Sequence, residues 1–211
     1  MRTMKVELTL TEPLLGTATA NPDVYGEFIA SRIPDDPDGE KAQEEENTLP
    51  SAEEEIQKAT TVFHADEEGH PFLYDYQIKG FFKDACGMLA RVKGDNAKSD
   101  GLKSHTLKAY KKEIDGLIRV SPRRIMLALP DGEETTFLER PLRASTAQGE
   151  RICLGRSEVA PAGTTLQFSI RIRRDALEDL VCEWLDYGED RGLGQWRNSG
   201  MGRFTWKLVE G

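Results

Sequence analysis

The chain has 211 residues, of which 38% are hydrophobic and 31% are charged, and its formal net charge is −9. This composition excludes a wholly disordered chain and allows one domain with a substantial core, which we place over residues 1–211. No apolar run approaches the ~20 residues that span a bilayer, and no apolar signal core follows the N-terminus. We therefore expect a cytoplasmic protein with no membrane partner.

The charge is divided unevenly along the chain. Residues 1–70 contain 17 acidic and 5 basic residues, whereas residues 71–211 contain 20 acidic and 23 basic residues. Within 79–124 the balance is 12 basic to 5 acidic. Because a polyanion responds to the local field more than to the total charge, the second part of the chain favours a nucleic-acid partner over an ordinary solvated surface.

The first elements are a strand and an acidic stretch. Val6, Leu8 and Leu10 alternate with polar residues, which predicts a half-buried strand over 4–10. Residues 34–55 contain two runs of three glutamates and almost nothing that a core could bury, so they predict a flexible acidic insertion. It is either an inert loop or an arm that contacts a basic partner, including another copy of the chain.

Two helices with basic surfaces are predicted next. Residues 77–92 show an apolar stripe at helical spacing, with Asp75 as the candidate cap. A second short helix begins near Ser104 and ends near Gly116, and its basic face would carry Lys108, Lys111 and Lys112.

The rest of the chain alternates between strands and one helix. Residues 117–120 and 124–129 predict strands, and Pro130–Gly132 predicts a hairpin turn to a strand over 135–142. Residues 143–163 are expected to be irregular, and 166–172 form the clearest strand. A helix then follows with Asp175 as cap, Glu178 in a capping box and Gly188 after its last turn, before a closing strand with Phe204, Trp206 and Leu208. The order predicts an α+β fold with a βαββαβ core, an antiparallel sheet backed by two helices.

The glycine-rich loop 188–202 is the strongest chemical signal. Five of its fifteen residues are glycine, and Arg203 follows it. Glycines let backbone amides approach an anion, arginines offer forks for phosphate, and a tryptophan offers a face for a base. The spacing matches neither a P-loop nor a dinucleotide fingerprint. The alternative is a loop whose glycines serve tight packing, with Trp196 in the core.

Four segments resemble the RAMP superfamily, the repeat-associated proteins of CRISPR effector complexes. The run GLGQWRNSGMGRF over 192–204 is similar to their C-terminal glycine-rich signature. Residues 8–16 resemble their first strand and turn, 76–82 the start of their first helix, and 159–165 the segment before a later strand. Together these segments span nearly the whole chain, whereas the acidic stretch has no counterpart.

The resemblance implies a ferredoxin-like, RNA-recognition-like fold with a thumb-like hairpin, for which 139–160 is the candidate. It also implies a non-catalytic backbone subunit that holds a guide RNA for base pairing with a target, in several copies along the RNA. The implied contacts are to the RNA backbone at the first helix and the glycine-rich loop 188–203. The candidate RNA-binding residues are Gln77, Lys79, Gly80, Lys83, Lys108, Lys111, Lys112, Arg140, Arg143, Arg191, Trp196, Arg197, Asn198, Ser199 and Arg203.

Two other functions remain open. A metal-independent endoribonuclease would need a base, an acid and a cation, which His105, Tyr110 and Lys108 or Lys112 could supply. A metal-assisted loop aspartate is conceivable at Asp23, Asp35 or Asp36, although nothing singles one out. The third function is a self-assembling phage or structural protein that pairs acidic and basic faces.

No catalytic residue, metal site or cofactor is predicted. Cys86, Cys153 and Cys182 are widely separated, and neither a CxxC pair nor a His/Cys cluster is present in the sequence. We expect all three to be free thiols.

Overall fold

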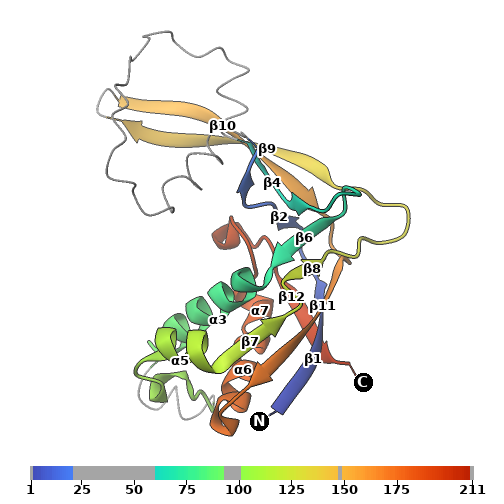
Figure 1. Ribbon diagram of the computed structural model, residues 1–211. Helices are drawn as coiled ribbons and strands as arrows, with labels where there is room; N and C mark the ends of the chain where they lie inside the picture. The colour runs from blue at the N-terminus through green and yellow to red at the C-terminus, as the bar shows by residue number, and fades with distance from the viewer. Residues whose placement is uncertain (1, 21–59, 93–100, 147–148, 210–211) are drawn as a thin grey trace, which may run out of the picture.

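A four-stranded antiparallel sheet forms the centre of the protein. The structure, a computed structural model, describes residues 2–20, 60–92, 101–146 and 149–209 (Figure 1). Strand β1 (Arg2–Leu10) alternates as the sequence predicts, with Val6, Leu8 and Leu10 buried and the intervening residues at least partly exposed. This alternation places one face of β1 in the core and the other toward solvent.

The order of this sheet is β12-β1-β11-β7. The outer strands are β7 (Ile118–Ser121) and β12 (Phe204–Leu208), and β11 (Thr165–Ile172) lies between β1 and β7. Every pairing is antiparallel. The two neighbours of β1 therefore both come from the second half of the chain.

Helices cover one face of this sheet, on the left of it in Figure 1. They are α3 (Asp75–Leu89), α5 (Tyr110–Leu117) and α6 (Glu178–Asp186). Helix α3 packs against α5 and α6, and its Phe82 ring lies 5.7 Å from that of the fully buried Trp184 on α6. The α+β class predicted from the sequence is confirmed.

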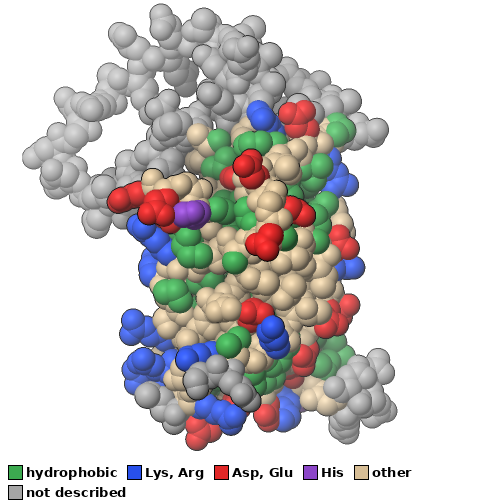
Figure 2. Space-filling view, turned by 90° about the vertical axis from the view of Figure 1, so that its right-hand side faces the viewer, with side chains coloured by type: hydrophobic (Ala, Val, Ile, Leu, Met, Phe, Trp, Pro, Cys, Tyr) green, Lys and Arg blue, Asp and Glu red, His purple; other side chains and the backbone are tan. Residues whose placement is uncertain are grey.

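The opposite face of the sheet carries polar and charged side chains. Glu7 on β1 pairs with Lys207 at 2.7 Å and accepts a hydrogen bond from Gln167 at 2.6 Å. Figure 2 views the right-hand side of Figure 1, and basic side chains gather along the lower left border of that side.

A second sheet contains a long hairpin. Its strands are β2 (Leu14–Leu15), β3 (Ala18–Thr19), β4 (Thr60–Val62), β9 (Thr136–Thr146) and β10 (Gly149–Ala160). Strands β9 and β10 pair from Thr146 and Gly149 down to Thr136 and Val159, and their far end projects away from the helices (Figure 1). The prediction of irregular chain over 143–163 was wrong, because paired strands occupy most of it.

A third sheet joins β5 (His64–Ala65), β6 (Pro71–Tyr74) and β8 (Arg124–Met126) in the order β5-β6-β8. Because β8 pairs with β6 and β9 pairs with β10, the hairpin predicted at Pro130–Gly132 does not form. The turn residues there connect two different sheets.

The predicted helix boundaries need three corrections. Asp75 is the first residue of α3, and it is Gln77 whose side chain accepts the N–H of Tyr74 at 2.7 Å. Asp175 begins a 3₁₀ turn, η2 (Asp175–Leu177), so Glu178 is the first residue of α6 and not the third. Gly188 does follow the last turn of α6, as predicted, but it lacks a positive φ and begins α7 (Gly188–Arg191). A Cβ there would lie 2.1 Å from the ring of Phe204, so this glycine allows close packing.

The remaining short elements are two 3₁₀ turns, η1 (Ser104–Thr106) and η3 (Arg197–Ser199). The predicted acidic insertion 34–55, with Asp35 and Asp36, lies outside the described residues, as does Asp23. Among the helices of the described residues, none is long and apolar enough to cross a membrane.

Candidate nucleic-acid interface

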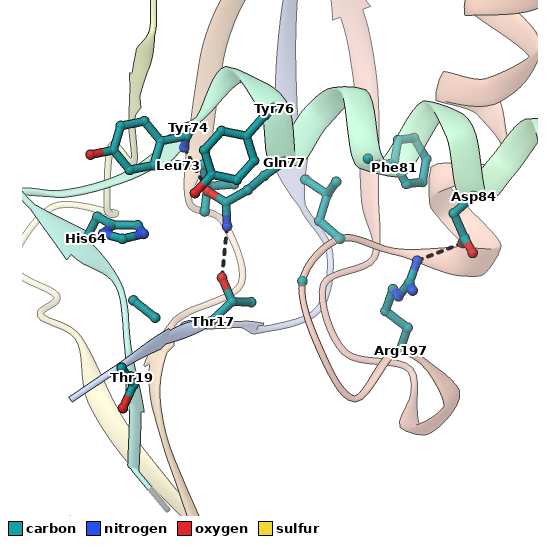
Figure 3. A pocket seen from close by; sticks show the side chains of 14 residues that line it. Thr17, Thr19, His64, Leu73, Tyr74, Tyr76, Gln77, Phe81, Asp84 and Arg197 are labelled. Carbon is teal, nitrogen blue, oxygen red and sulfur yellow. Dashed lines mark hydrogen bonds and ion pairs between the residues drawn. The ribbon is translucent and has the colours of Figure 1, made fainter. Parts of the chain in front are cut away.

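A groove of about 620 Å³ separates the start of α3 from the glycine-rich loop. Its walls come from four parts of the chain that are apart in sequence, and one of them is His64 of β5 (Figure 3). Gln77, Gly80 and Phe81 come from α3, Gly194 and Arg197 from the loop, and Thr17, Ala18 and Thr19 from the chain after β2. The two segments that the sequence singles out thus meet in one hollow.

Gln77 connects two of these walls. Its Oε1 accepts the N–H of Tyr74, and its Nε2 donates to Thr17 Oγ1 at 2.8 Å. Gly80, one turn further along α3, is exposed, and no described atom lies within 4 Å of the place where a Cβ would stand. A missing side chain at this position keeps the wall of the groove open to a ligand backbone.

Asp84 holds two arginines of the loop at the other end of the groove. Its Oδ2 accepts from Arg191 Nε at 2.8 Å and from Arg197 Nη1 at 2.7 Å. Burial opposes the ionisation of Asp84, but the hydrogen bonds and charges of both arginines outweigh it and keep its pKa below the ordinary value. Arg191 also donates to Asn198 Oδ1 at 3.0 Å, so both guanidinium groups have fixed orientations.

The two lysines of α3 lie away from the groove. Lys83 Nζ is 2.7 Å from Asp115 Oδ1, and Lys79 Nζ donates to the Asp115 carbonyl at 3.1 Å. The hydrogen bond from Lys83 is the main cause of a lowered pKa at Asp115. Lys79 instead lines a separate hollow of about 260 Å³ beside β7, so the structure divides the candidates on α3 between two surfaces.

The glycine-rich loop is a compact structure. A Cβ at Gly202 would lie 2.2 Å from the Leu193 carbonyl oxygen, and one at Gly192 would lie 2.5 Å from that of Met201. Both residues have positive φ, so they are required for conformation and for space. These glycines serve tight packing, as the alternative interpretation stated.

Several of the loop amides have partners within the protein. The N–H groups of five residues donate to carbonyl groups: Gly192, Leu193, Ser199, Gly200 and Gly202. These five amides are therefore not available to an anion-binding nest of the kind that the composition suggested.

Gln195 fixes the loop to the second sheet. Its Nε2 donates to the Gly16 carbonyl, to Thr61 Oγ1 at 2.6 Å and to Ser157 Oγ at 3.2 Å. The next residue, Trp196, has a φ of 55°, an uncommon left-handed conformation for a residue other than glycine. Its ring is only half-buried, so the alternative that Trp196 belongs to the core was wrong.

The hairpin meets the loop through Arg140 of β9. The guanidinium carbon lies 5.4 Å from the centre of the Trp196 ring, and Nη1 donates to Ser199 Oγ at 2.8 Å. A hollow of about 680 Å³ lies at this junction, and Arg191, Arg197 and Asn198 also line it. Five of the predicted loop candidates thus lie with Arg140 around one hollow, which borders the groove through Arg197 and Gly194.

Other candidates lie elsewhere. The helix predicted from Ser104 begins only at Tyr110, so Lys111 and Lys112 lie in the first turn of α5 and Lys108 lies before it. All three lysines are exposed and line neither hollow, and Arg203 is exposed after the loop. His105 is exposed in η1 and likewise does not line the groove. The side chain of Arg143 lies outside the described residues.

Several residues of the groove were missed by sequence reasoning. They are Thr17, Thr19, His64, Leu73, Tyr74, Tyr76, Asp84 and Leu193. Tyr74 and Tyr76 flank the predicted start of the helix, and their spacing was an available signal. Asp84 is the one acidic residue of its helical segment between Lys79 and Arg91, which was a second signal.

No protein-family model matches the chain, and neither does any curated protein. Among solved structures, it is similar to a chain of the Type III-B Cmr-beta bound to cognate target RNA, with 14% identity, a TM-score of 0.48, and coverage of 99% of this chain and 58% of that chain. This chain therefore spans less than two thirds of that relative.

A chain of a Type IV-B CRISPR complex is also similar, with 14% identity, a TM-score of 0.46, and coverage of 99% of this chain and 90% of that chain. Both of these chains belong to CRISPR complexes.

Proposed function

We propose that this protein is an RNA-binding subunit that holds a guide RNA along its backbone in the groove between α3 and the glycine-rich loop. The observation that carries this proposal is the meeting of Gln77 and Gly80 with Gly194 and Arg197 around one hollow. These residues belong to two sequence motifs that lie more than 100 positions apart, and both motifs line the same groove.

The groove has the donors that an RNA backbone requires. The amide of Gln77 and the hydroxyl groups of Thr17 and Thr19 suit ribose and phosphate oxygens, and Arg197 supplies positive charge. The open wall at Gly80 allows a backbone to approach α3 closely. These groups carry no pattern that would distinguish one base from another, which fits a protein that leaves sequence recognition to base pairing.

The contacts between Asp84 and the loop arginines are compatible with phosphate binding. A guanidinium has five N–H donors, and among the described residues Asp84 receives one from Arg197. Phosphate can bind the remaining donors while Asp84 keeps the side chain in position. Asp84 thus acts as a positioning residue for two cationic groups.

The central sheet and the β9–β10 hairpin support two further parts of the proposal, the core topology and the thumb. The sheet order β12-β1-β11-β7, with α3 and α6 on one face, supports a ferredoxin-like βαββαβ core. The paired strands β9 and β10 support the assignment of a thumb to 139–160. We propose that several copies line up along one RNA, and that the protein contributes no chemistry of its own.

RNA affinity measured at several salt concentrations tests this function. Fluorescence anisotropy with a labelled single-stranded RNA should give a dissociation constant that rises steeply with salt. Combined replacement of Gln77 and Arg197 by Ala should raise it at least about tenfold and reduce the salt slope by about one. Arg174→Ala is the matched control, because Arg174 is half-exposed and pairs with Glu113 outside the groove.

Two results would contradict the proposal. Equal RNA affinities for the double variant and the control would show that the groove does not bind RNA. An absence of RNA binding by the wild-type protein at low salt would refute the proposed function. RNA cleavage in EDTA would instead support the endoribonuclease. The mass of the complex as a function of RNA length measures the number of copies.

A further inference from the structure

A strip of aromatic rings crosses the third sheet and ends at the groove. Tyr74 and Tyr76 stack with ring centres 5.3 Å apart and planes 17° apart. His64 meets Tyr74 edge-on at 4.8 Å and stacks on Phe72 at 5.8 Å. In Figure 3 the rings of Tyr74, Tyr76 and His64 lie at one end of the groove, and Asp84 and Arg197 lie at the other.

Two arginines accompany these rings. The Arg123 guanidinium carbon lies 5.3 Å from the centre of Tyr74 and 5.5 Å from that of Tyr76, and that of Arg124 lies 5.3 Å from Phe72. Arg123 is also held by Asp75 at 2.6 Å. Alternating aromatic and cationic groups on one surface are typical of platforms on which unpaired bases stack, because every base has a π-face and a nearby phosphate.

The strip lies between two hollows and forms part of both. One is the groove, and the other is a hollow of about 370 Å³ that contains Phe72 and Arg124. His64 and Tyr74 line both of them. A strand that leaves the groove at this end would therefore pass directly over the rings.

Tyr76 shows the clearest departure from ordinary packing. It is 50% exposed, although it lies in the first turn of a helix with a well-packed inner face. Because Tyr76 is half-exposed although it stacks on Tyr74, it presents aromatic surface to solvent at the mouth of the groove. The core residues of α3 lie on the other side of the helix, so core packing does not explain this ring.

We propose that His64, Tyr74 and Tyr76 form a stacking platform for unpaired nucleobases of a strand that enters or leaves the groove. This inference rests on the proposed RNA-binding function and adds a contact to bases where the groove itself contacts the backbone. Arg123 and Arg124 border the platform and attract the phosphates between the stacked bases. The cations favour a nucleic acid over a protein segment as the occupant.

The state of His64 fits this role. Burial lowers its pKa below the ordinary value, which favours the neutral imidazole. A neutral imidazole next to two tyrosines gives an uncharged stacking surface, and the charge is left to the arginines beside it.

The test compares a normal oligonucleotide with one that lacks bases. Affinities are measured for a single-stranded RNA of about 12 nucleotides and for an abasic phosphodiester of the same length. Tyr76→Ala should weaken binding of the normal RNA roughly 5- to 100-fold and leave binding of the abasic chain unchanged. Tyr76→Phe should restore binding, and 2-aminopurine placed in the RNA should lose its quenching only in Tyr76→Ala.

Leu208→Ala is the matched control, since Leu208 is 54% exposed on an edge strand far along the chain. If Tyr76→Ala weakens binding of both ligands equally, or of neither, the stacking platform is refuted, whereas the proposal that the groove binds the RNA backbone is not. If the wild-type protein binds neither ligand, the proposed function itself is refuted. An unchanged RNA affinity would leave a protein segment as the occupant of the strip and would overturn the inference.

Discussion

Asp84 is the residue whose replacement tests the groove most directly. Asp84→Asn keeps the size of the side chain and removes the negative charge that holds Arg191 and Arg197. The three side chains are 28%, 21% and 27% exposed, so their contacts are less screened than those of a surface pair. Two charge-assisted hydrogen bonds at this burial should contribute about 1–3 kcal/mol to the free energy of unfolding.

The difference in the free energy of unfolding between wild type and Asp84→Asn should depend on pH, because the pKa of Asp84 is lowered in the folded state. A carboxyl group whose pKa is lower in the folded state stabilises the fold above its unfolded pKa of about 3.9. This contribution is lost as pH falls through the folded pKa. Urea denaturation should therefore separate wild type from Asp84→Asn at pH 7, and the difference in the free energy of unfolding should shrink as pH falls below about 5.

Limited proteolysis provides the second measurement, because release of two arginines should make the glycine-rich loop easier to cleave. Asp179→Asn is the control, since Asp179 is 68% exposed and its one described ion pair is with Lys103. A difference between wild type and Asp84→Asn that stayed constant from pH 7 to pH 3 would refute the reasoning. So would equal stability at pH 7.

Two further predictions concern packing and thiol chemistry. Gly188→Ala should lower the free energy of unfolding by about 1–3 kcal/mol, since its Cβ would meet the Phe204 ring, as measured by urea denaturation. Gly116→Ala, where no described atom lies within 4 Å, should be neutral or slightly stabilising, and equal losses at both sites would contradict the packing argument. Burial raises the pKa of Cys86 to about 11, so its thiol should stay unmodified by iodoacetamide at pH 8 until the protein unfolds, and rapid labelling in the folded state would contradict this.

The strands and helices of the central sheet were predictable because their patterns are strong and local. β1 and β11 alternate over eight or more residues, and the apolar stripe of α3 continues for four turns. Which strand pairs with which was not predictable in the same way. β9 reads equally well as a partner of β8 or of β10, and register depends on contacts that a local pattern does not contain.

The groove was predictable in part. Its glycine-rich wall and the start of α3 carry motifs, so Gln77, Gly80 and Arg197 could be selected from the sequence. The charge pairing could not, because Asp84 meets Arg191 and Arg197 across more than 100 residues of chain. Counting basic residues overestimated the free charge of α3, since Asp115 contacts both Lys79 and Lys83.

The position of β1 in the middle of its sheet has a consequence for folding. Its partners begin at Thr165 and Phe204, so more than 150 residues must be synthesised before the first of them can pair. Until then the apolar side chains of Val6, Leu8 and Leu10 have no strand beside them. A topology dominated by such distant pairings folds slowly and leaves an aggregation-prone strand exposed during synthesis, so chaperone binding should matter most for this segment.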